Sequence, residues 1–472
     1  MPYFIHFNIQ QFFRSLILYS SYQITPIFCH LCHIMDPNNL PDWNTFYNEC
    51  VEDFMNDTFV EDMMQQEMEF YQQQQQHANT VRPKKTRRVI KRDREAGNER
   101  LMKDYFSENP VYTEELFRRR FRMRKHVFLR IVEALGSYNP YFLMSVDAVG
   151  RQGLSPLQKC TAAIRMLAYG SPADSVDEYV RIGESTAIEC LKNFVEGVCE
   201  VFGGQYLRRP NEEDMTRLLQ WGESRGFPGM LGSIDCMHWE WKNCPVAWKG
   251  QYTRGDHGRP TIMLEAVASQ DLWIWHAFFG IAGSNNDITV LNQSPVFNEV
   301  LRGAAPMVKF RVNETMYHMG YYLADGIYPE WGTFVKTIPM PQGEKKQKFA
   351  KRQEAARKDV ERAFGVLQSR FAIVRGPSRW WHPNDMKSII YACIILHNMI
   401  VEDERNTYKG NFVYEQVNND ISDAEVLSGP IPAFRNMLER RAHQIEKSIH
   451  RQLQADLVEH IWDLPEINNN ET

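Results

Sequence analysis

The stretch GMLGSIDCMHWEW, residues 229–241, decides the fold, because its residue types are those of a buried β-strand. Ile234 and Met237 are expected to lie in the core. Asp235 lies between them, and burying a lone carboxylate costs on the order of several kcal/mol unless it is paired or binds a metal. Asp235 is therefore the first candidate for a functional acid, with a purely structural role as the alternative.

Four further runs predict strands that join this one. RPTIMLEAVASQ (259–270) and LWIWHAFFGIAG (272–283) are separated only by a turn, which predicts a meander with the first strand. A helical stretch follows through about Val300. The runs ETMYHMGYYLADGIYP (314–329) and WGTFVKTIP (331–339) then predict two more strands. Strands that meander and then alternate with helices indicate an α/β fold with a mixed five-stranded sheet.

Two helices are predicted after these strands. In RKDVERAFGVLQSRF (357–371) the apolar residues recur at spacings of four, three and four, which predicts one buried stripe. Glu361 lies at the edge of this stripe, between Arg357 and Arg362, as either a salt-bridged surface residue or a functional acid. NDMKSIIYACIILHNMIVEDE (384–404) predicts an apolar helix in which His397 is a core residue rather than a ligand.

Helices are also predicted before the sheet. Ser155 and Pro156 begin one helix as N-cap and first residue, and Gly170 ends it. A second helix runs from about residue 184 to Gly203. The pair fits either a helix-turn-helix that reads DNA or an ordinary small bundle. The second helix carries only Lys192 as a base, and a further amphipathic element with a cationic face is predicted over 117–135.

The charge of the 472-residue chain is unevenly distributed. The net charge is −5, yet residues 1–80 hold one base and ten acids, whereas residues 81–130 hold seventeen bases and seven acids. An acidic segment followed by a basic one indicates a partner that carries phosphate. The basic run is interpreted as a nuclear-import or DNA-binding arm, or as a solvated charge run. Its candidate DNA-binding residues are Arg82, Lys84, Lys85, Arg87 and Arg88.

Composition excludes some protein classes. No run of about eighteen apolar residues occurs, so no membrane span and no membrane partner is expected. The nine scattered cysteines favour a reducing compartment. The Gln-rich region 1–80 is predicted to be largely disordered. Within it, residues 1–34 are interpreted as a gene-model extension or a disordered leader.

Three acids from distant parts of the chain form the candidate catalytic set. Asp235 lies in the first strand, Asp325 at the end of the fourth, and Glu361 on the later helix. Asp325 precedes a glycine, so it is also a candidate turn former. Three converging carboxylates can hold two divalent cations, and their oxygens suit Mg²⁺ or Mn²⁺.

Four motifs carry a resemblance to a known family. GSIDCMHWEW, GSNNDITVLNQSP, LADGIYPEW and ARKDVERAFGVLQSRF occur in this order within residues 100–405. They resemble the PIF/Harbinger transposases of plants and the transposase-derived nucleases related to them. The resemblance implies a ribonuclease-H-like DDE nuclease domain preceded by a helical DNA-binding region. It also assigns Asp235, Asp325 and Glu361 as the acidic triad.

The resemblance further implies a reaction and its partners. The enzyme would cut and join phosphodiester bonds at the terminal inverted repeats of its element and in target DNA, by a two-metal mechanism in the nucleus. A Myb-like DNA-binding helper protein is expected, and a homo-oligomer is left open. The alternative is a host-recruited, non-catalytic adaptor associated with DNA or chromatin.

Several auxiliary residues accompany the triad. Asp287 is the rival for the second acid, and it also fits a loop or a helix N-cap. His238 is a candidate neighbour of the metals or an ordinary strand residue. Arg362 is expected to orient Glu361 or to contact a phosphate, with a surface ion pair as the alternative. Lys249, Arg254 and Arg259 are further candidates for DNA contact.

These features divide the chain into five predicted regions. They are a disordered leader (1–80), a basic linker (81–105), a helical helix-turn-helix-like domain (106–212), the DDE nuclease domain (213–405) and a polar tail with one charged helix near 433–460 (406–472).

Overall fold

The computed structural model describes most of the chain after residue 89. The described ranges are 90–255, 258–297, 307–408, 425–427 and 447–465. The predictions for residues 1–80, and for the arm residues Arg82, Lys84, Lys85, Arg87 and Arg88, lie outside these ranges. Residues 91–472 form one compact unit, which contains all the elements that follow.

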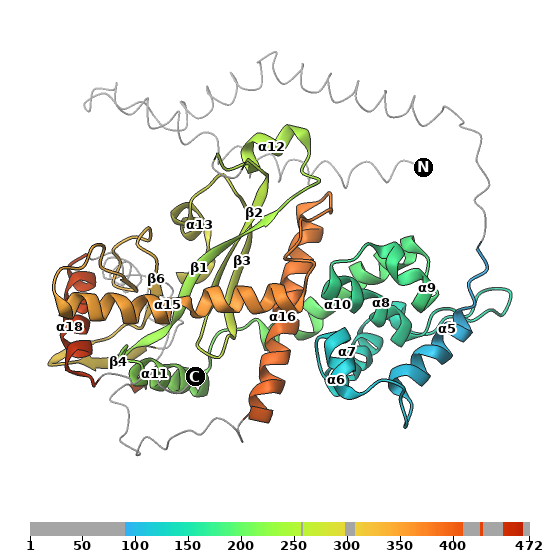
Figure 1. The fold of residues 1–472 in the computed structure, drawn as a ribbon, viewed down its shortest axis with the longest axis horizontal. Helices are drawn as coiled ribbons and strands as arrows, with labels where there is room; N and C mark the ends of the chain where they lie inside the picture. Colours follow the sequence, from blue (N-terminus) through green and yellow to red (C-terminus); the bar gives the residue numbers. More distant parts are fainter. Residues whose placement is uncertain (1–89, 256–257, 298–306, 409–424, 428–446, 466–472) are drawn as a thin grey trace, which may run out of the picture. The chain divides into compact units, whose positions relative to one another are not determined.

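Helices make up the first part of this unit (Figure 1). They are α5 (Arg94–Leu101), α6 (Glu114–Phe121), α7 (Lys125–Tyr138), α8 (Pro156–Tyr169), α9 (Asp177–Val180), α10 (Glu184–Tyr206) and α11 (Glu212–Ser224), with shorter turns at Met102–Phe106, Pro140–Phe142 and Ala173–Val176.

The first predicted helix forms as its caps indicate. The Ser155 side chain accepts a hydrogen bond from the Gln158 backbone, and the Gln158 side chain binds back, which completes a capping box. Gly170 ends α8 with a φ of 61°, a conformation that favours glycine.

The prediction of a single amphipathic element over 117–135 is wrong, because Arg122 adopts a φ of 65° and separates α6 from α7. The second predicted helix also runs beyond Gly203 to Tyr206.

A five-stranded sheet is the centre of the fold, and it confirms the predicted mixed sheet. Its strands are β1 (Met230–Glu240), β2 (Thr261–Ala268), β3 (Ile274–Ala282), β6 (Tyr321–Ala324) and β7 (Phe334–Lys336). They lie in the order β3-β2-β1-β6-β7. The first three strands form an antiparallel meander, and β6 and β7 run parallel to β1. Since β1 is the middle strand, its polar side chains are shielded by neighbours on both edges.

Helices cover the sheet and join it to the helices before it. α15 (Glu344–Arg370) packs on β1, and α16 (Pro383–Tyr408) packs against β3 and α10. The stripe predicted on α15 is confirmed, because Val360, Phe364, Leu367 and Phe371 are all buried. The helices α12 (Val246–Tyr252) and α13 (Asp287–Gln293) lie between the sheet strands in sequence.

A second, smaller sheet and a last helix were not fully anticipated. The strands β4 (Met307–Val312), β5 (Thr315–Tyr317) and β8 (Glu425–Leu427) pair in the order β5-β4-β8. Of the charged helix predicted near 433–460, residues 433–446 lie outside the described ranges. The described part forms α18 (Lys447–Asp463). Its Leu457 and Ile461 are fully buried in a core that includes Phe349 of α15. The end of the described chain is therefore part of the folded unit.

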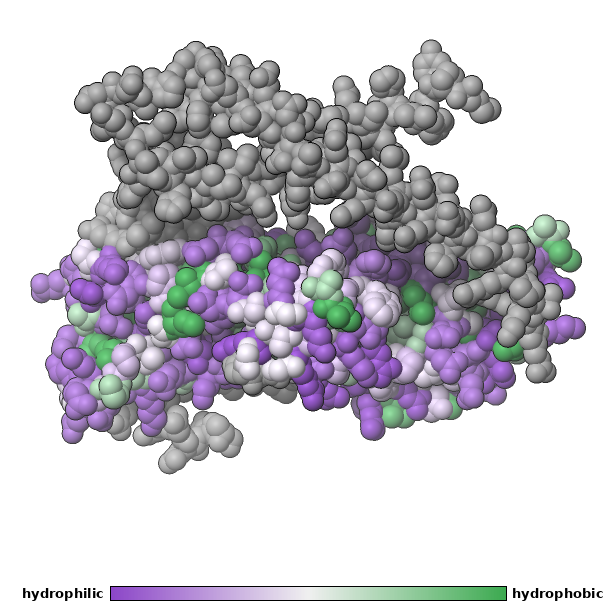
Figure 2. Space-filling model, turned by 90° about the horizontal axis from the view of Figure 1, so that it is seen from above, coloured by the Kyte–Doolittle hydropathy of each residue, from purple (hydrophilic) through white to green (hydrophobic). Residues whose placement is uncertain are grey.

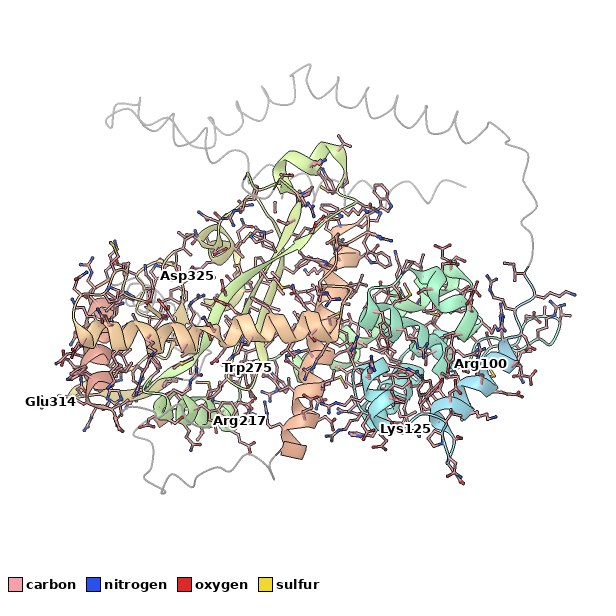
Figure 3. All side chains as sticks on the ribbon, viewed as in Figure 1. Arg100, Lys125, Arg217, Trp275, Glu314 and Asp325 are labelled. Atoms are coloured by element: carbon pink, nitrogen blue, oxygen red, sulfur yellow. The ribbon has the colours of Figure 1, made fainter. Side chains whose placement is uncertain are left out.

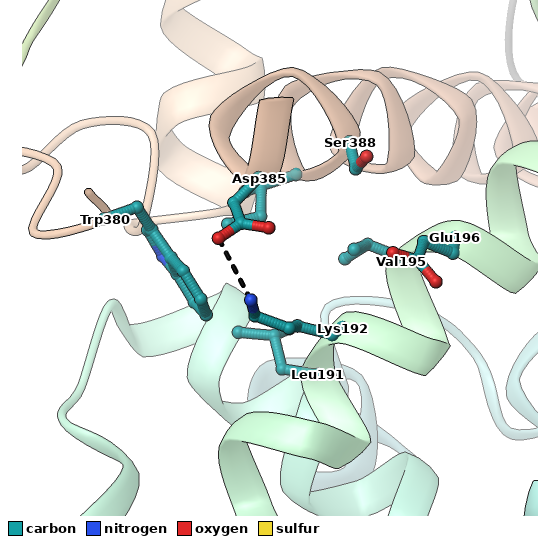
Figure 4. A pocket seen from close by; sticks show the side chains of 8 residues that line it. Leu191, Lys192, Val195, Glu196, Trp380, Asp385 and Ser388 are labelled. Atoms are coloured by element: carbon teal, nitrogen blue, oxygen red, sulfur yellow. Dashed lines mark hydrogen bonds and ion pairs between the residues drawn. The ribbon is translucent and has the colours of Figure 1, made fainter. Parts of the chain in front are cut away.

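The interface between α10 and α16 also bears on the helix-turn-helix hypothesis. The Lys192 ammonium lies 3.1 Å from the Asp385 carboxylate and 5.5 Å from the centre of the Trp380 ring, at the side of a small pocket (Figure 4). The one basic side chain of α10 is thus paired within the protein. This argues against α10 as a helix that inserts into a DNA groove.

His397 and Asn398 anchor α16 to the sheet. The prediction for His397 is confirmed, because it is fully buried and its Nε2 lies 2.8 Å from the Leu272 carbonyl oxygen. Asn398 is also fully buried. Its amide accepts from Ile274 N at 2.9 Å and donates to the carbonyl oxygens of Ile274 and Tyr206, both at 2.7 Å. One side chain therefore joins β3, α16 and the end of α10.

The replacement Asn398→Ala should lower the free energy of unfolding by about 2–4 kcal/mol, because it leaves buried backbone groups of Ile274 and Tyr206 without partners. Urea denaturation of the full-length protein measures this change. Asn384→Ala, at an exposed position of the same helix, is the matched control and should shift stability by less than about 0.5 kcal/mol. Equal effects of the two replacements would contradict the anchoring role.

Candidate active site

Asp235 lies near the middle of the central strand. Its partner on β2 is Ala266, and its side chain is 19% exposed. The carboxylate accepts a hydrogen bond of 2.8 Å from the Cys236 backbone amide. The side chain therefore sits in a largely buried place with few groups to compensate its charge.

The strand register brings Asp325 beside Asp235. β6 runs parallel to β1, and Ser233 is aligned with Leu323. These are the last paired residues of the two strands, and Asp325 directly follows the end of β6 (Figure 3). Continuing the register by two residues along both chains places Asp325 next to Asp235. Adjacent strands lie about 4.8 Å apart, so the two backbones are close there. Asp325 also begins a turn, since its carboxylate accepts from Gly326 N at 2.5 Å. The turn-forming and functional interpretations are thus compatible.

Glu361 reaches the same region from α15. The Ser233 hydroxyl donates to the Ala356 carbonyl oxygen at 3.4 Å, and Gln353 donates to the carbonyl oxygens of Ala324 and Val335. These bonds fix the helix across β1, β6 and β7. The Glu361 side chain is 43% exposed, so it lies at the rim of the core, as its place beside the apolar stripe predicts.

Arg357 links two of the acids, and the sequence analysis missed this role. Its guanidinium lies 3.2 Å from Asp235 Oδ2 and 2.9 Å from Glu361 Oε1. The sequence signal was available, because Arg357 precedes Glu361 by four residues and shares its helix face. One guanidinium thus joins the first and third predicted acids.

Burial and neighbouring charge perturb the carboxyl of Asp235. Burial raises its pKa to about 6, while the Cys236 amide and Arg357 oppose this shift and the charges of Asp287 and Glu361 add to it. A pKa shifted in this way is common at functional sites and also occurs in structural ion pairs. At pH 7 the group is mostly ionised.

Asp287 lies within electrostatic reach of two predicted triad members. It is the first residue of α13, and the helix N-cap is Asn286 instead, whose side chain accepts from Thr289 N. Burial raises the pKa of Asp287, and the negative charge of Asp325 raises it further. Asp287 contributes in turn to the raised pKa of Asp235. It therefore remains the rival ligand, placed near both acids.

The other auxiliary residues lie elsewhere. His238 Nδ1 lies 2.9 Å from the Thr261 hydroxyl, and its odd spacing from Asp235 directs it to the opposite face of the strand. Arg362 is paired with the fully buried Asp359, which Arg225 also contacts at 2.5 Å. Arg362 was considered as the residue that orients Glu361, but Arg357 makes that contact.

The three bases predicted around α12 are all exposed, but they differ in their surroundings. Arg259 lies 3.1 Å from the Glu240 carboxylate. Lys249 is at the C-terminal end of α12. Arg254 acts electrostatically on Asp287, whose pKa its positive charge lowers. The loop that carries Arg254 is therefore near Asp287.

The carboxylate oxygens of this site are the donor type that Mg²⁺ and Mn²⁺ prefer. Over the described ranges, however, no three His, Cys, Asp or Glu side chains gather closely enough to hold one ion. Between Asp235 and Glu361 lies the Arg357 guanidinium. The donors thus fit such an ion chemically, and a shared ion requires Arg357 to move away from the two carboxylates.

Comparison with known proteins gives the class of this chain. Residues 204–408 match the family described as "Plant transposon protein", and residues 97–136 match "Domain of unknown function (DUF8418)". The predicted resemblance to Harbinger-type plant transposon proteins is confirmed by the match of residues 204–408. They contain the whole five-stranded sheet, α15 and the three candidate acids.

Individual relatives agree with this family. The chain is 26% identical over 262 residues to "Protein ALP1-like" of Arabidopsis thaliana, a match that covers 54% of this chain and 63% of the relative. It is 22% identical over 296 residues to "Putative nuclease HARBI1" of Bos taurus and of Homo sapiens, which covers 61% of this chain and 78% of each relative. No solved structure matches. The chain is thus related to transposase-derived proteins of a nuclease-like family.

The replacement Asp235→Asn should stabilise the protein at pH 7.5 and have little effect at pH 4. The folded-state pKa of about 6 lies above the unfolded value, so the folded protein binds more protons and its stability falls as pH rises from about 4 to about 6. The asparagine avoids this loss, which is at most about 3 kcal/mol. Urea denaturation at both pH values, without divalent ions, measures it.

Asp174→Asn, at an exposed position, serves as the control and should change stability equally at the two pH values. A stability gain for Asp235→Asn that is the same at pH 4 and pH 7.5 would show that the charge of Asp235 is not the cause.

Proposed function

We propose that the chain is a metal-dependent DNA nuclease of the transposase type, which cuts and joins phosphodiester bonds by a two-metal DDE mechanism. One observation carries the proposal. Arg357 joins Asp235 to Glu361, and the register of β1 and β6, continued two residues past their last pair, places Asp325 next to Asp235. Carboxylates placed in one region of a protein are commonly paired with or bound to cations, because crowding negative charges costs stability.

The sheet supports a ribonuclease-H-like domain. Three antiparallel strands followed by two parallel ones, with acids on the first and fourth positions and on a later helix, is the arrangement that the family resemblance implies. The helices before the sheet are proposed to assist DNA binding, although the pairing of Lys192 argues against α10 as the reading element.

Asp235, Asp325 and Glu361 would hold the two ions, with Asp287 as the rival for the second position. When bound, Mg²⁺ or Mn²⁺ would lower the pKa of the attacking water or 3′-hydroxyl and stabilise the leaving oxygen. Arg357 would keep Asp235 ionised and close to Glu361 beforehand, because its charge lowers the pKa of Asp235. Its guanidinium would then turn outward, where it can pair with a DNA phosphate.

The partners follow from the same hypothesis. The substrates are the terminal inverted repeats of the element and target DNA, and the site of action is the nucleus. Arg82, Lys84, Lys85, Arg87 and Arg88, together with Lys249, Arg254 and Arg259, would contact phosphates, so affinity should fall steeply with salt. A Myb-like helper protein is proposed to direct the chain to its site.

Each of the replacements Asp235→Asn, Asp325→Asn and Glu361→Gln should reduce Mg²⁺-dependent cleavage at least about 100-fold, because each removes a ligand from a set that acts as a unit. The assay follows nicking and cutting of a plasmid that carries the genomic DNA flanking the coding sequence, with the helper protein present and absent. Binding of the same DNA in EDTA should remain within about twofold of the wild type.

Glu354→Gln, at an exposed position of the same helix, is the matched control and should cut normally. Normal cutting by Asp325→Asn together with loss in Asp287→Asn would reassign the second ligand. Normal cutting by all three triad variants would overturn the proposed function.

A further inference from the structure

Two segments far apart in sequence meet at the end of β1. Trp241 forms a bridge with Ser378, and Lys242 N donates to the Ser378 carbonyl oxygen at 2.9 Å. The Asn243 side chain donates to the Arg379 carbonyl oxygen at 2.6 Å. These bonds hold residues 241–255, which include α12, beside residues 375–382. The two segments together are called the α12 surface here.

The α12 surface carries positive charge and no acid. Residues 241–255 and 375–382 contain no Asp or Glu. The two segments contribute five exposed basic side chains, and these are Lys242, Lys249, Arg254, Arg375 and Arg379. A surface of this composition attracts a polyanion.

Two large aromatic rings are exposed among these Lys and Arg side chains. Trp248 is 45% exposed and Trp381 is 64% exposed, and next to Trp248 in α12 the side chain of Val246 is 90% exposed. No residue of α12 is buried. On the face shown in Figure 2, apolar side chains reach the surface in small groups between hydrophilic ones, which is ordinary for a protein surface.

The buried Trp241 holds the surface in place. It is fully buried, its ring centre lies 6.1 Å from that of Trp248, and its indole N–H donates to the Trp380 carbonyl oxygen at 2.8 Å. Trp381 follows directly in the chain. One buried residue therefore contacts the ring of Trp248 and holds the backbone next to Trp381, which reduces the ordering that binding would require.

We propose that the α12 surface binds unpaired DNA. The rings of Trp248 and Trp381 would stack on nucleobases, and the surrounding Lys and Arg side chains would contact phosphates. Basic grooves with exposed aromatic rings are the means by which proteins bind single strands, and an intact duplex offers no free base face. This inference rests on the proposed function, because it concerns the strand on which the acids would act.

The distance to the acids gives the length of strand involved. Trp241 directly follows β1 and lies six residues after Asp235, which corresponds to about 20 Å at about 3.3 Å per residue. A DNA strand covers this distance with about six nucleotides. The near edge of the α12 surface is therefore about six nucleotides of strand away from Asp235. A DNA end separated during cutting would be single-stranded there.

The test measures binding without catalysis. Full-length protein is titrated in EDTA into a fluorescein-labelled fifteen-residue oligothymidylate and into a labelled twenty-base-pair duplex, and anisotropy is recorded. Trp248→Ala and Trp381→Ala should each weaken binding to the oligothymidylate about 5- to 100-fold and change duplex binding less than twofold. The replacements by Phe should retain most of the affinity.

Two controls separate stacking from other effects. Trp462→Ala removes an exposed tryptophan of α18 and should leave both affinities unchanged. Lys249→Gln and Arg379→Gln should weaken binding to both DNAs and reduce its salt dependence. Thermal unfolding of each variant verifies that it folds.

The outcomes distinguish this inference from the proposed function. Oligothymidylate affinity that is unchanged in Trp248→Ala and Trp381→Ala, or absent in the wild type, would overturn the inference and point to a protein partner for the rings. Equal losses on single strand and duplex would also overturn it. Asp235→Asn should bind the oligothymidylate normally, so loss of cutting and loss of stacking are independent results.

Discussion

The structure depends on a carboxylate placed in the middle strand of a sheet. Asp235 lies where neighbours exclude most water, and its raised pKa of about 6 records the cost of ionising it there. The Arg357 guanidinium compensates part of this cost and at the same time holds Glu361. Because one cation serves two acids, the geometry of β1 and the geometry of α15 are coupled. The sheet and the helix must form together for either acid to be placed.

The helices before the sheet are likewise held by side chains that bond two elements at once. α16 lies against β3 and α10, and Asn398 hydrogen-bonds the backbones of both. The helices and the sheet also share one continuous apolar core, which includes Phe128 of α7 and Trp273 before β3. Motion of the helical part relative to the sheet would break buried polar contacts as well as apolar ones. The two parts therefore form one unit.

Much of the fold could be predicted from local patterns, and the failures have physical reasons. Ser155 and Gly170 gave the ends of α8 because capping is a local interaction. The break at Arg122 was missed, since a basic residue carries no signal for a positive φ. The small sheet was missed because β5 and β8 are three residues each, and short strands are fixed by their partners rather than by their own sequence. At the site, the motifs predicted the candidate acids, but the ion-pair partner of each acid depends on packing. For this reason Arg362 was considered as the partner of Glu361, whereas the structure shows Arg357 there.

The position of α18 has a consequence for the helix that carries Glu361. Leu457 and Ile461 complete the core beneath the N-terminal half of α15, and Lys348 donates to carbonyl oxygens of Trp462 and Leu464. Without α18, the apolar side chain of Phe349 on α15 would lose this cover and face water. The position of Glu361 therefore depends on a helix that lies far beyond it in the sequence.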